Sequence, residues 1–309
     1  MVRRRPSSVR SDGAVTTPPR IPLRISVSMP ATFSQRRPVA RRRPASTFIM
    51  LIRAGGALII KLLPASALAG PALPEGFVYL RDIDPTIVQD IRYAGSHNFV
   101  GRPIRGYLAA ECILSEPAAN ALEAVQRKLA EKKLSLIVWD CYRPKRAVDD
   151  FLQWSKDPSH SEMKTEFYPR TDKEKLFALG YLAKPSAHSR GSTVDVGIVP
   201  TAFSSAPPPN LLQSLKACTS PKGERFEDGT IDFGTGYDCL DVLANTSNAR
   251  AGGTALRNRQ TLTSYMQGAG FRPYAREWWH FELINEPFHR GGFDFEVSAS
   301  PSSTEGPTR

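Results

Sequence analysis

Two short segments of the sequence combine histidine with acidic side chains. Residues 186–195 read Ser-Ala-His-Ser-Arg-Gly-Ser-Thr-Val-Asp, and residues 277–280 read Glu-Trp-Trp-His. Catalytic zinc is bound by three side chains with nitrogen or oxygen donors, and a fourth position stays open for water. His188, Asp195 and His280 make up such a set. We therefore predict that these three residues bind one Zn²⁺ per chain.

Glu277 is the candidate general base. It precedes His280 by three residues, and side chains at this spacing point to opposite faces of a regular strand. A bulge or a shift in the pleat is therefore needed before the Glu277 carboxylate can take a proton from water on the metal. Each motif alone is common in proteins without a metal, and only the presence of both favours a metal site.

The charge of the chain is concentrated at its N-terminus. The 309 residues hold 41 Lys+Arg and 30 Asp+Glu, a formal net charge of +11, which invites a nucleic-acid interpretation. Residues 1–49 contain 11 Arg and one acidic residue, and residues 50–69 add two basic residues. Residues 70–309 are left with 28 basic and 29 acidic residues, a net charge of about −1. This balance excludes a nucleic-acid partner for residues 70–309.

The first 69 residues are predicted to lie outside the fold. Residues 1–49 are rich in Arg, Pro and Ser, so we expect a disordered basic extension or a stretch upstream of the true start. Residues 50–69 combine a charged start, a short apolar stretch and an Ala-x-Ala site, which together are typical of a signal peptide cleaved after Ala69. We expect a periplasmic or secreted protein without stable membrane insertion after processing. The alternatives are an uncleaved anchor and a cytoplasmic protein.

The elements that must position these motifs indicate one α+β domain over residues 70–297, followed by a disordered tail over 298–309. We expect a small antiparallel sheet flanked by helices, with the zinc site at the sheet. A long loop rich in Pro, Ser and Gly is expected over about 201–231. Strands are predicted over 77–80, 134–139, 194–199 and 278–284, and helices over 117–133, 144–154 and 258–266.

The motifs also carry a family resemblance. Ser-x-His-Ser-Arg-Gly-Ser-x-x-Asp together with Glu-Trp-Trp-His resembles the zinc D-alanyl-D-alanine dipeptidases, the VanX-like branch of the D,D-peptidase family. The resemblance covers about residues 76–297 and keeps its motifs in order. Further matching stretches are Asp-Ile-Arg-Tyr-Ala at 90–94, His-Asn-Phe-Val-Gly-Arg-Pro at 97–103, the Trp-Asp-Cys-Tyr-Arg-Pro block within 138–148, Phe-Gly-Thr-Gly-Tyr-Asp at 233–238, Asn-Arg at 258–259 and Phe-Asp-Phe at 293–295.

The resemblance implies a zinc metallopeptidase that hydrolyses the small molecule D-Ala-D-Ala to two D-Ala. It assigns a role to each of seven residues of this sequence. The implied roles are zinc ligand for His188, Asp195 and His280, general base for Glu277, oxyanion stabilisation for Arg143, binding of the substrate ammonium for Asp238, and pocket lining for Ser186.

Three features depart from the family pattern. Cys141 stands where relatives have a small residue, the loop over about 200–232 is longer, and the export signal is unlike the cytoplasmic enzymes. The four cysteines form no Cys-x-x-Cys motif, so a thiolate metal site is not expected. In an exported protein, Cys218 and Cys239 could form a disulfide that clamps the long loop. Cys141 is interpreted as a packing residue.

Two other functions remain open at the level of sequence. One is a D,D-carboxypeptidase acting on muropeptides, which would need an open groove where a dipeptidase needs an enclosed pocket closed by Asp238. The other is a non-catalytic, zinc-stabilised cell-wall-binding module, against which the presence of both Glu277 and Arg143 argues.

Overall fold

A computed structural model of the chain describes residues 72–203 and 215–301. The predictions for residues 1–49 and 50–69 lie outside these ranges, as do residues 302–309 of the expected tail. Within the described part of the chain, no helix is long and apolar enough to cross a membrane.

The main sheet has five strands in the order β2-β4-β5-β7-β6. Its centre is formed by β4 (Leu134–Asp140), β5 (Thr193–Pro200) and β7 (Glu277–Leu283), which run antiparallel to one another. Strand β6 (Phe271–Tyr274) continues this pattern at one edge, and β2 (Val88–Gln89) pairs in parallel with β4 at the other. The predicted α+β class is confirmed, with a sheet that is antiparallel except at β2.

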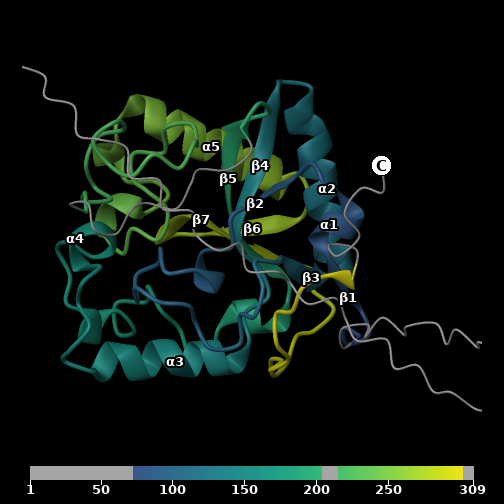
Figure 1. Ribbon diagram of the computed structural model, residues 1–309. Coiled ribbons are helices and arrows are strands. Elements are labelled where there is room, and N and C mark those ends of the chain that lie inside the picture. Colours follow the sequence, from purple (N-terminus) through teal and green to yellow (C-terminus); the bar gives the residue numbers. More distant parts are fainter. Residues whose placement is uncertain (1–71, 204–214, 302–309) are drawn as a thin grey trace, which may run out of the picture. The chain divides into compact units, whose positions relative to one another are not determined.

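Three longer helices flank this sheet (Figure 1). Helix α2 (Glu116–Ala130) packs against β4 through a buried apolar stripe, and α5 (Gly253–Gln267) packs against β6. Helix α3 (Lys145–Lys156) lies along the lower edge of the view, on the opposite side from α5. Pro144 is the N-cap of α3, where its fixed φ and missing N–H are tolerated.

Short elements complete the domain. A second sheet pairs β1 (Phe77–Tyr79) antiparallel with β3 (Ile113–Ser115). Helices α1 (Leu80–Ile83) and α4 (Lys164–Phe167) are single turns. The 3₁₀ helices are η1 (Arg92–Ala94), η2 (Lys173–Lys175), η3 (Ala187–Arg190), η4 (Val242–Ala244) and η5 (Ala249–Ala251).

All seven predicted strands and helices are present in the structure, with shifted ends. The helix predicted from 258 begins at Gly253, because Ala255 already contributes to the buried face of α5. The described parts of the predicted loop, 201–203 and 215–231, contain no helix or strand. Strands β2, β3 and β6 were not predicted, because they are two to four residues long and too short to show a periodic pattern.

All four cysteines form disulfides. Cys218 is bonded to Cys239, the pairing considered above for an exported protein. The interpretation of Cys141 as a packing residue is incomplete, because Cys141 is buried in the core and is also bonded to Cys112, 29 residues earlier in the chain. Four cysteines allow three pairings, and nothing in their spacing distinguishes among them.

Candidate active site and metal centre

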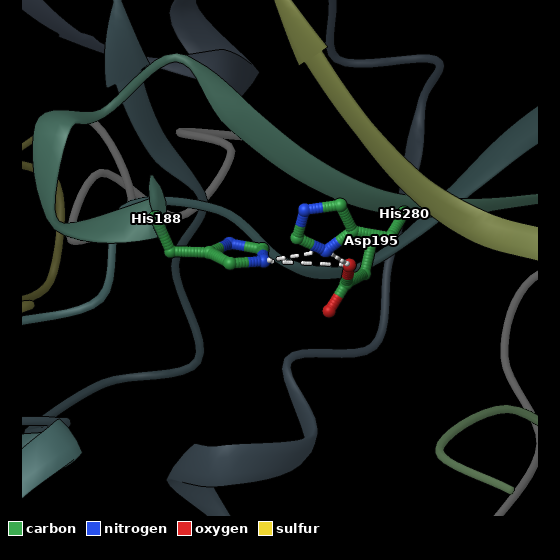
Figure 2. Close-up of side chains that lie close together, drawn as sticks. All are labelled: His188, Asp195 and His280. Carbon is green, nitrogen blue, oxygen red and sulfur yellow. Dashed lines mark hydrogen bonds and ion pairs between the residues drawn. The ribbon is translucent and has the colours of Figure 1, made fainter. Parts of the chain in front are cut away.

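The three predicted metal ligands converge where two central strands meet a 3₁₀ helix (Figure 2). Asp195 on β5 lies opposite His280 on β7 in the antiparallel ladder, so their side chains share one face of the sheet. His188 comes from η3 and faces both of them. Asp195 Oδ1 lies 3.2 Å from His280 Nδ1 and 3.4 Å from His188 Nε2, and the two imidazole nitrogens are 3.3 Å apart.

The turn that follows His188 depends on a glycine. Gly191 has φ 80°, a left-handed conformation that side chains rarely adopt. A Cβ atom at this position would lie 2.2 Å from the Phe77 ring, so any larger residue would also collide with the core. Gly191 thus allows the chain to leave η3 and enter β5 within a few residues, which places His188 beside Asp195.

The donor atoms of this cluster suit a divalent metal ion. Asp195 Oδ1 is buried and accepts no hydrogen bond, so its close polar neighbours are the two imidazole nitrogens. The Nδ1–H of His188 donates to the Cys141 carbonyl at 2.8 Å, which leaves Nε2 free to bind a metal. On the far side of the His280 ring, Nε2 lies 3.7 Å from Glu282 Oε1. Two imidazole nitrogens and one carboxylate oxygen are a donor set that catalytic zinc commonly uses.

Glu277 lies beside this cluster because β7 is irregular. In the pairing of β6 with β7, Pro273 is opposite Phe281, whereas the next residue, Tyr274, is opposite Glu277. This register shift places Glu277 Oε2 3.6 Å from His280 Nδ1, so the irregularity that the sequence spacing requires is present. Burial raises the pKa of Glu277 to about 8, against the opposing effect of the His280 charge.

Arg143 is held rigidly just after β4. Its Nε and Nη2 atoms lie 2.9 and 2.8 Å from Asp140 Oδ2, while the Tyr107 hydroxyl donates to Asp140 Oδ1 at 2.5 Å. The guanidinium carbon lies 5.2 Å from the centre of the Tyr93 ring, which adds a cation–π contact. Arg143 Nη2 is 3.9 Å from Asp195 Oδ2. A fixed positive charge therefore borders the cluster of candidate metal ligands.

Asp238 is a buried carboxylate that lines the same site. It is only 4% exposed, has φ 55°, and accepts a hydrogen bond from the Tyr93 hydroxyl at 2.9 Å. Burial and the nearby charge of Asp195 raise the pKa of the Asp238 carboxyl well above its usual range. A cationic group entering here would stabilise the ionised form of this carboxylate.

One cavity of about 160 Å³ joins these groups. All seven site residues predicted from the sequence line it, so the structure separates none of them from the others. They are Arg143, Ser186, His188, Asp195, Asp238, Glu277 and His280.

Comparison with known proteins identifies the family. The family described as D-Ala-D-Ala dipeptidase matches residues 74–202 and 224–298. This chain belongs to the D-Ala-D-Ala dipeptidase family. The D-alanyl-D-alanine dipeptidase of Enterococcus faecalis is 33% identical over 226 residues, which are 73% of this chain and 100% of that protein. The D-alanyl-D-alanine dipeptidase of Streptomyces coelicolor is 32% identical over 222 residues, 72% of this chain and 98% of that protein. The D-alanyl-D-alanine dipeptidase of Escherichia coli is 28% identical over 207 residues, which are 67% of this chain and 83% of that protein.

Membership of this dipeptidase family makes the chain a peptidase with a small dipeptide substrate. All seven predicted site residues that line the cavity fall inside the matched ranges. The unmatched stretch, 203–223, lies in the loop that was expected to be longer than in relatives, and it contains Cys218.

Several groups that shape the dipeptidase site were not predicted from the sequence. Tyr93 and Asp140 lie in stretches quoted for the resemblance, so their positions could have been found there. The Tyr237 hydroxyl donates to Asp195 Oδ2 at 3.1 Å, and this residue directly precedes Asp238. Tyr181 and Tyr274 also line the cavity, but they come from a loop and an edge strand without any recognisable motif.

Proposed function

We propose that this protein hydrolyses D-Ala-D-Ala to two molecules of D-Ala in a zinc-dependent reaction. The observation that carries the proposal is the convergence of two imidazoles, four carboxylates and one guanidinium on a single small cavity. The activity for which the relatives are named supports the choice of substrate.

His188, Asp195 and His280 are the proposed zinc ligands. Asp195 Oδ1, which accepts no hydrogen bond, and the His188 Nδ1–H bond, which leaves Nε2 as the unprotonated nitrogen, both favour this assignment. When bound, zinc would lower the pKa of water to about 7 and polarise the scissile carbonyl.

Glu277 is the proposed general base. Its carboxylate is close to the cluster without belonging to the ligand set, so it can accept a proton from the attacking water and pass it to the leaving amine. Arg143 would stabilise the oxyanion that develops on the carbonyl. Because a guanidinium keeps its proton and Asp140 fixes its orientation, the positive charge is in place before the reaction begins.

Asp238 is proposed to bind the free ammonium of the dipeptide, with Ser186 lining the same pocket. A cavity of about 160 Å³ is smaller than the roughly 300–1,000 Å³ of typical small-molecule sites. This size favours a dipeptide over the longer muropeptide that a D,D-carboxypeptidase would bind. The joint placement of Glu277 and Arg143 likewise favours catalysis over a non-catalytic wall-binding module.

An oxidising compartment is the proposed location of this enzyme. Two disulfides in one domain are typical of periplasmic or secreted proteins and rare in the cytoplasm. Edman sequencing of the mature protein from its host tests this proposal. A mature N-terminus at Gly70 is expected, and a cytoplasmic protein that retains residues 50–69 would contradict it.

The central test of the proposed activity is a hydrolysis assay of the purified chain with D-Ala-D-Ala, L-Ala-L-Ala and a pentapeptide ending in D-Ala-D-Ala. Hydrolysis of D-Ala-D-Ala alone is expected, with activity lost to a chelator and restored by Zn²⁺. Release of D-Ala from the pentapeptide at a comparable rate would instead establish the carboxypeptidase. Full activity in the chelator would refute the dependence on a metal.

A further inference from the structure

We infer that the two disulfides are separate positioning devices for the two halves of the active site. In this inference, which rests on the proposed function, Cys112–Cys141 positions the metal ligand His188 together with Arg143. Cys218–Cys239 positions Asp238, the proposed ammonium site.

The first disulfide holds the segment that follows β4. The Cys141 carbonyl accepts the hydrogen bond from His188 Nδ1 at 2.8 Å, and the backbone N–H of Arg143 donates to the His188 carbonyl at 3.2 Å. Strand β4 ends at Asp140, so the turn that makes both contacts lies beyond the regular ladder. The bond to Cys112 is a covalent cross-link between this turn and a distant segment of the domain.

Cys112 is itself firmly placed, which makes it a suitable anchor. It is fully buried, its backbone N–H donates to Gln89 Oε1 at 2.9 Å, and its carbonyl accepts from Leu80 at 2.9 Å. The backbone N–H of Tyr142 donates to Ile113 at 2.9 Å, beside the disulfide. Without the disulfide, only hydrogen bonds would hold this turn, so the Cys141 carbonyl should shift and change the orientation of the His188 ring.

The second disulfide holds the segment that carries Asp238. This residue lies in a stretch without helix or strand, and Cys239 follows it directly. The backbone N–H of Gly236 donates to the Cys218 carbonyl at 3.0 Å, and that of Leu240 donates to Phe167 at 2.8 Å. Because no strand pairs with this segment, the disulfide and these backbone bonds hold its main chain, and the Tyr93 hydroxyl holds the Asp238 carboxylate itself.

Cys218 belongs to the stretch 203–223, which the family match leaves out. This chain therefore attaches its proposed ammonium-binding segment to a stretch that the family match does not cover. The same segment supplies Tyr237, which donates to Asp195 Oδ2, but Asp195 is also held by β5 between two neighbouring strands. Movement of the segment should consequently disturb Asp238 far more than the metal ligand.

The proposed roles of the two disulfides predict different effects when each disulfide is removed by a double substitution in the full chain. C112A/C141A should weaken zinc binding about 10–100-fold, the usual effect of losing support behind a metal ligand, and should lower kcat at saturating zinc. C218A/C239A should keep the zinc affinity and raise KM for D-Ala-D-Ala at least about 10-fold, with a smaller change in kcat. A general loss of stability would not divide the effects in this way.

The experiment measures zinc affinity by competition with a chromophoric chelator and steady-state kinetics at saturating zinc. Thermal unfolding identifies an assay temperature at which each variant is folded, and the two variants serve as matched controls because each removes one disulfide. If C112A/C141A does not fold, C112A/C141V replaces more of the lost volume and is measured instead. Equal changes of the same parameter in both variants, or no change in either, would overturn the inference.

Failure of the proposed function can be distinguished from failure of the positioning roles. Wild-type chain that binds zinc but leaves D-Ala-D-Ala intact would refute the proposed function and not the positioning roles. The positioning role of Cys112–Cys141 would still be tested by comparing the zinc affinity of C112A/C141A with that of the wild type. The positioning role of Cys218–Cys239 would be tested by calorimetric binding of D-Ala-D-Ala to the wild type and to C218A/C239A. An unchanged affinity in C218A/C239A would overturn this role.

Discussion

Asp195 and His280 are direct partners in the antiparallel ladder of β5 and β7, with Asp195 Oδ1 3.2 Å from His280 Nδ1. The main-chain hydrogen bonds of the sheet therefore hold two of the three proposed ligands in place. The third, His188, depends on a 3₁₀ turn and on the hydrogen bond to the Cys141 carbonyl. Metal binding should accordingly be most sensitive to changes around His188.

Substitution of His188 tests the ligand assignment. H188A should lose stoichiometric zinc, because two donors remain where catalytic zinc uses three. The matched control is H289A, since His289 is exposed and lies outside the cluster. Metal content after dialysis, measured by atomic emission, should be one zinc per chain in the control and well below one in H188A. A full zinc complement in H188A would refute the assignment.

Substitution of Glu277 separates catalysis from metal binding. E277Q keeps the size of the side chain but cannot accept the proton, so kcat should fall about 10²–10⁴-fold while one zinc per chain remains bound. Zinc content and hydrolysis of D-Ala-D-Ala are measured on the same preparation. Hydrolysis at the wild-type rate would exclude Glu277 as the base.

The positions of these site residues were predictable from the sequence to different degrees. His188, Asp195, Glu277 and His280 were identifiable because each lies in a compact motif. The irregular pairing that turns Glu277 toward His280 was stated only as a requirement, since it depends on how β6 pairs with β7.

Other parts of the site arise only from tertiary packing. Tyr181 and Tyr274 line the cavity but come from different parts of the fold, and no local pattern connects them. The pairing of Cys112 with Cys141 was missed for the same reason, because it depends on where β3 lies relative to the end of β4. Long apolar runs predicted the central strands well, whereas β2, with two residues, gives no signal by itself.

Arg143 provides a test of the fixed positive charge. R143K keeps a cation but loses the two contacts to Asp140 and the planar geometry, so kcat should fall about 10²–10³-fold with little change in zinc affinity. R127A is the matched control, because Arg127 lies on the outer face of α2 with 67% of its side chain exposed. Activity of R143K within twofold of the control would contradict the proposed role.

Asp238 should determine whether the substrate needs a free amino group. D238N should raise KM for D-Ala-D-Ala about 100-fold, because a buried ion pair with the substrate ammonium is lost. N-acetyl-D-Ala-D-Ala should be a very poor substrate of the wild type, and D238N should discriminate far less between the two compounds. The ratio of kcat/KM values for the two compounds is the measurement. An unchanged ratio in D238N would assign ammonium binding to another residue.

Gly191 links the stability of the fold to the proposed metal site. G191A places a β-carbon 2.2 Å from the Phe77 ring at a residue with φ 80°, so it should suffer both backbone strain and a core collision. Gly223 has φ 90°, and a β-carbon added there would meet no atom within 4 Å, so G223A should suffer the strain alone, about 1–2 kcal/mol. Chemical denaturation should show a clearly larger loss for G191A, together with weaker zinc binding, because the displaced turn carries His188. Equal losses in the two variants would show that the core absorbs the added methyl group.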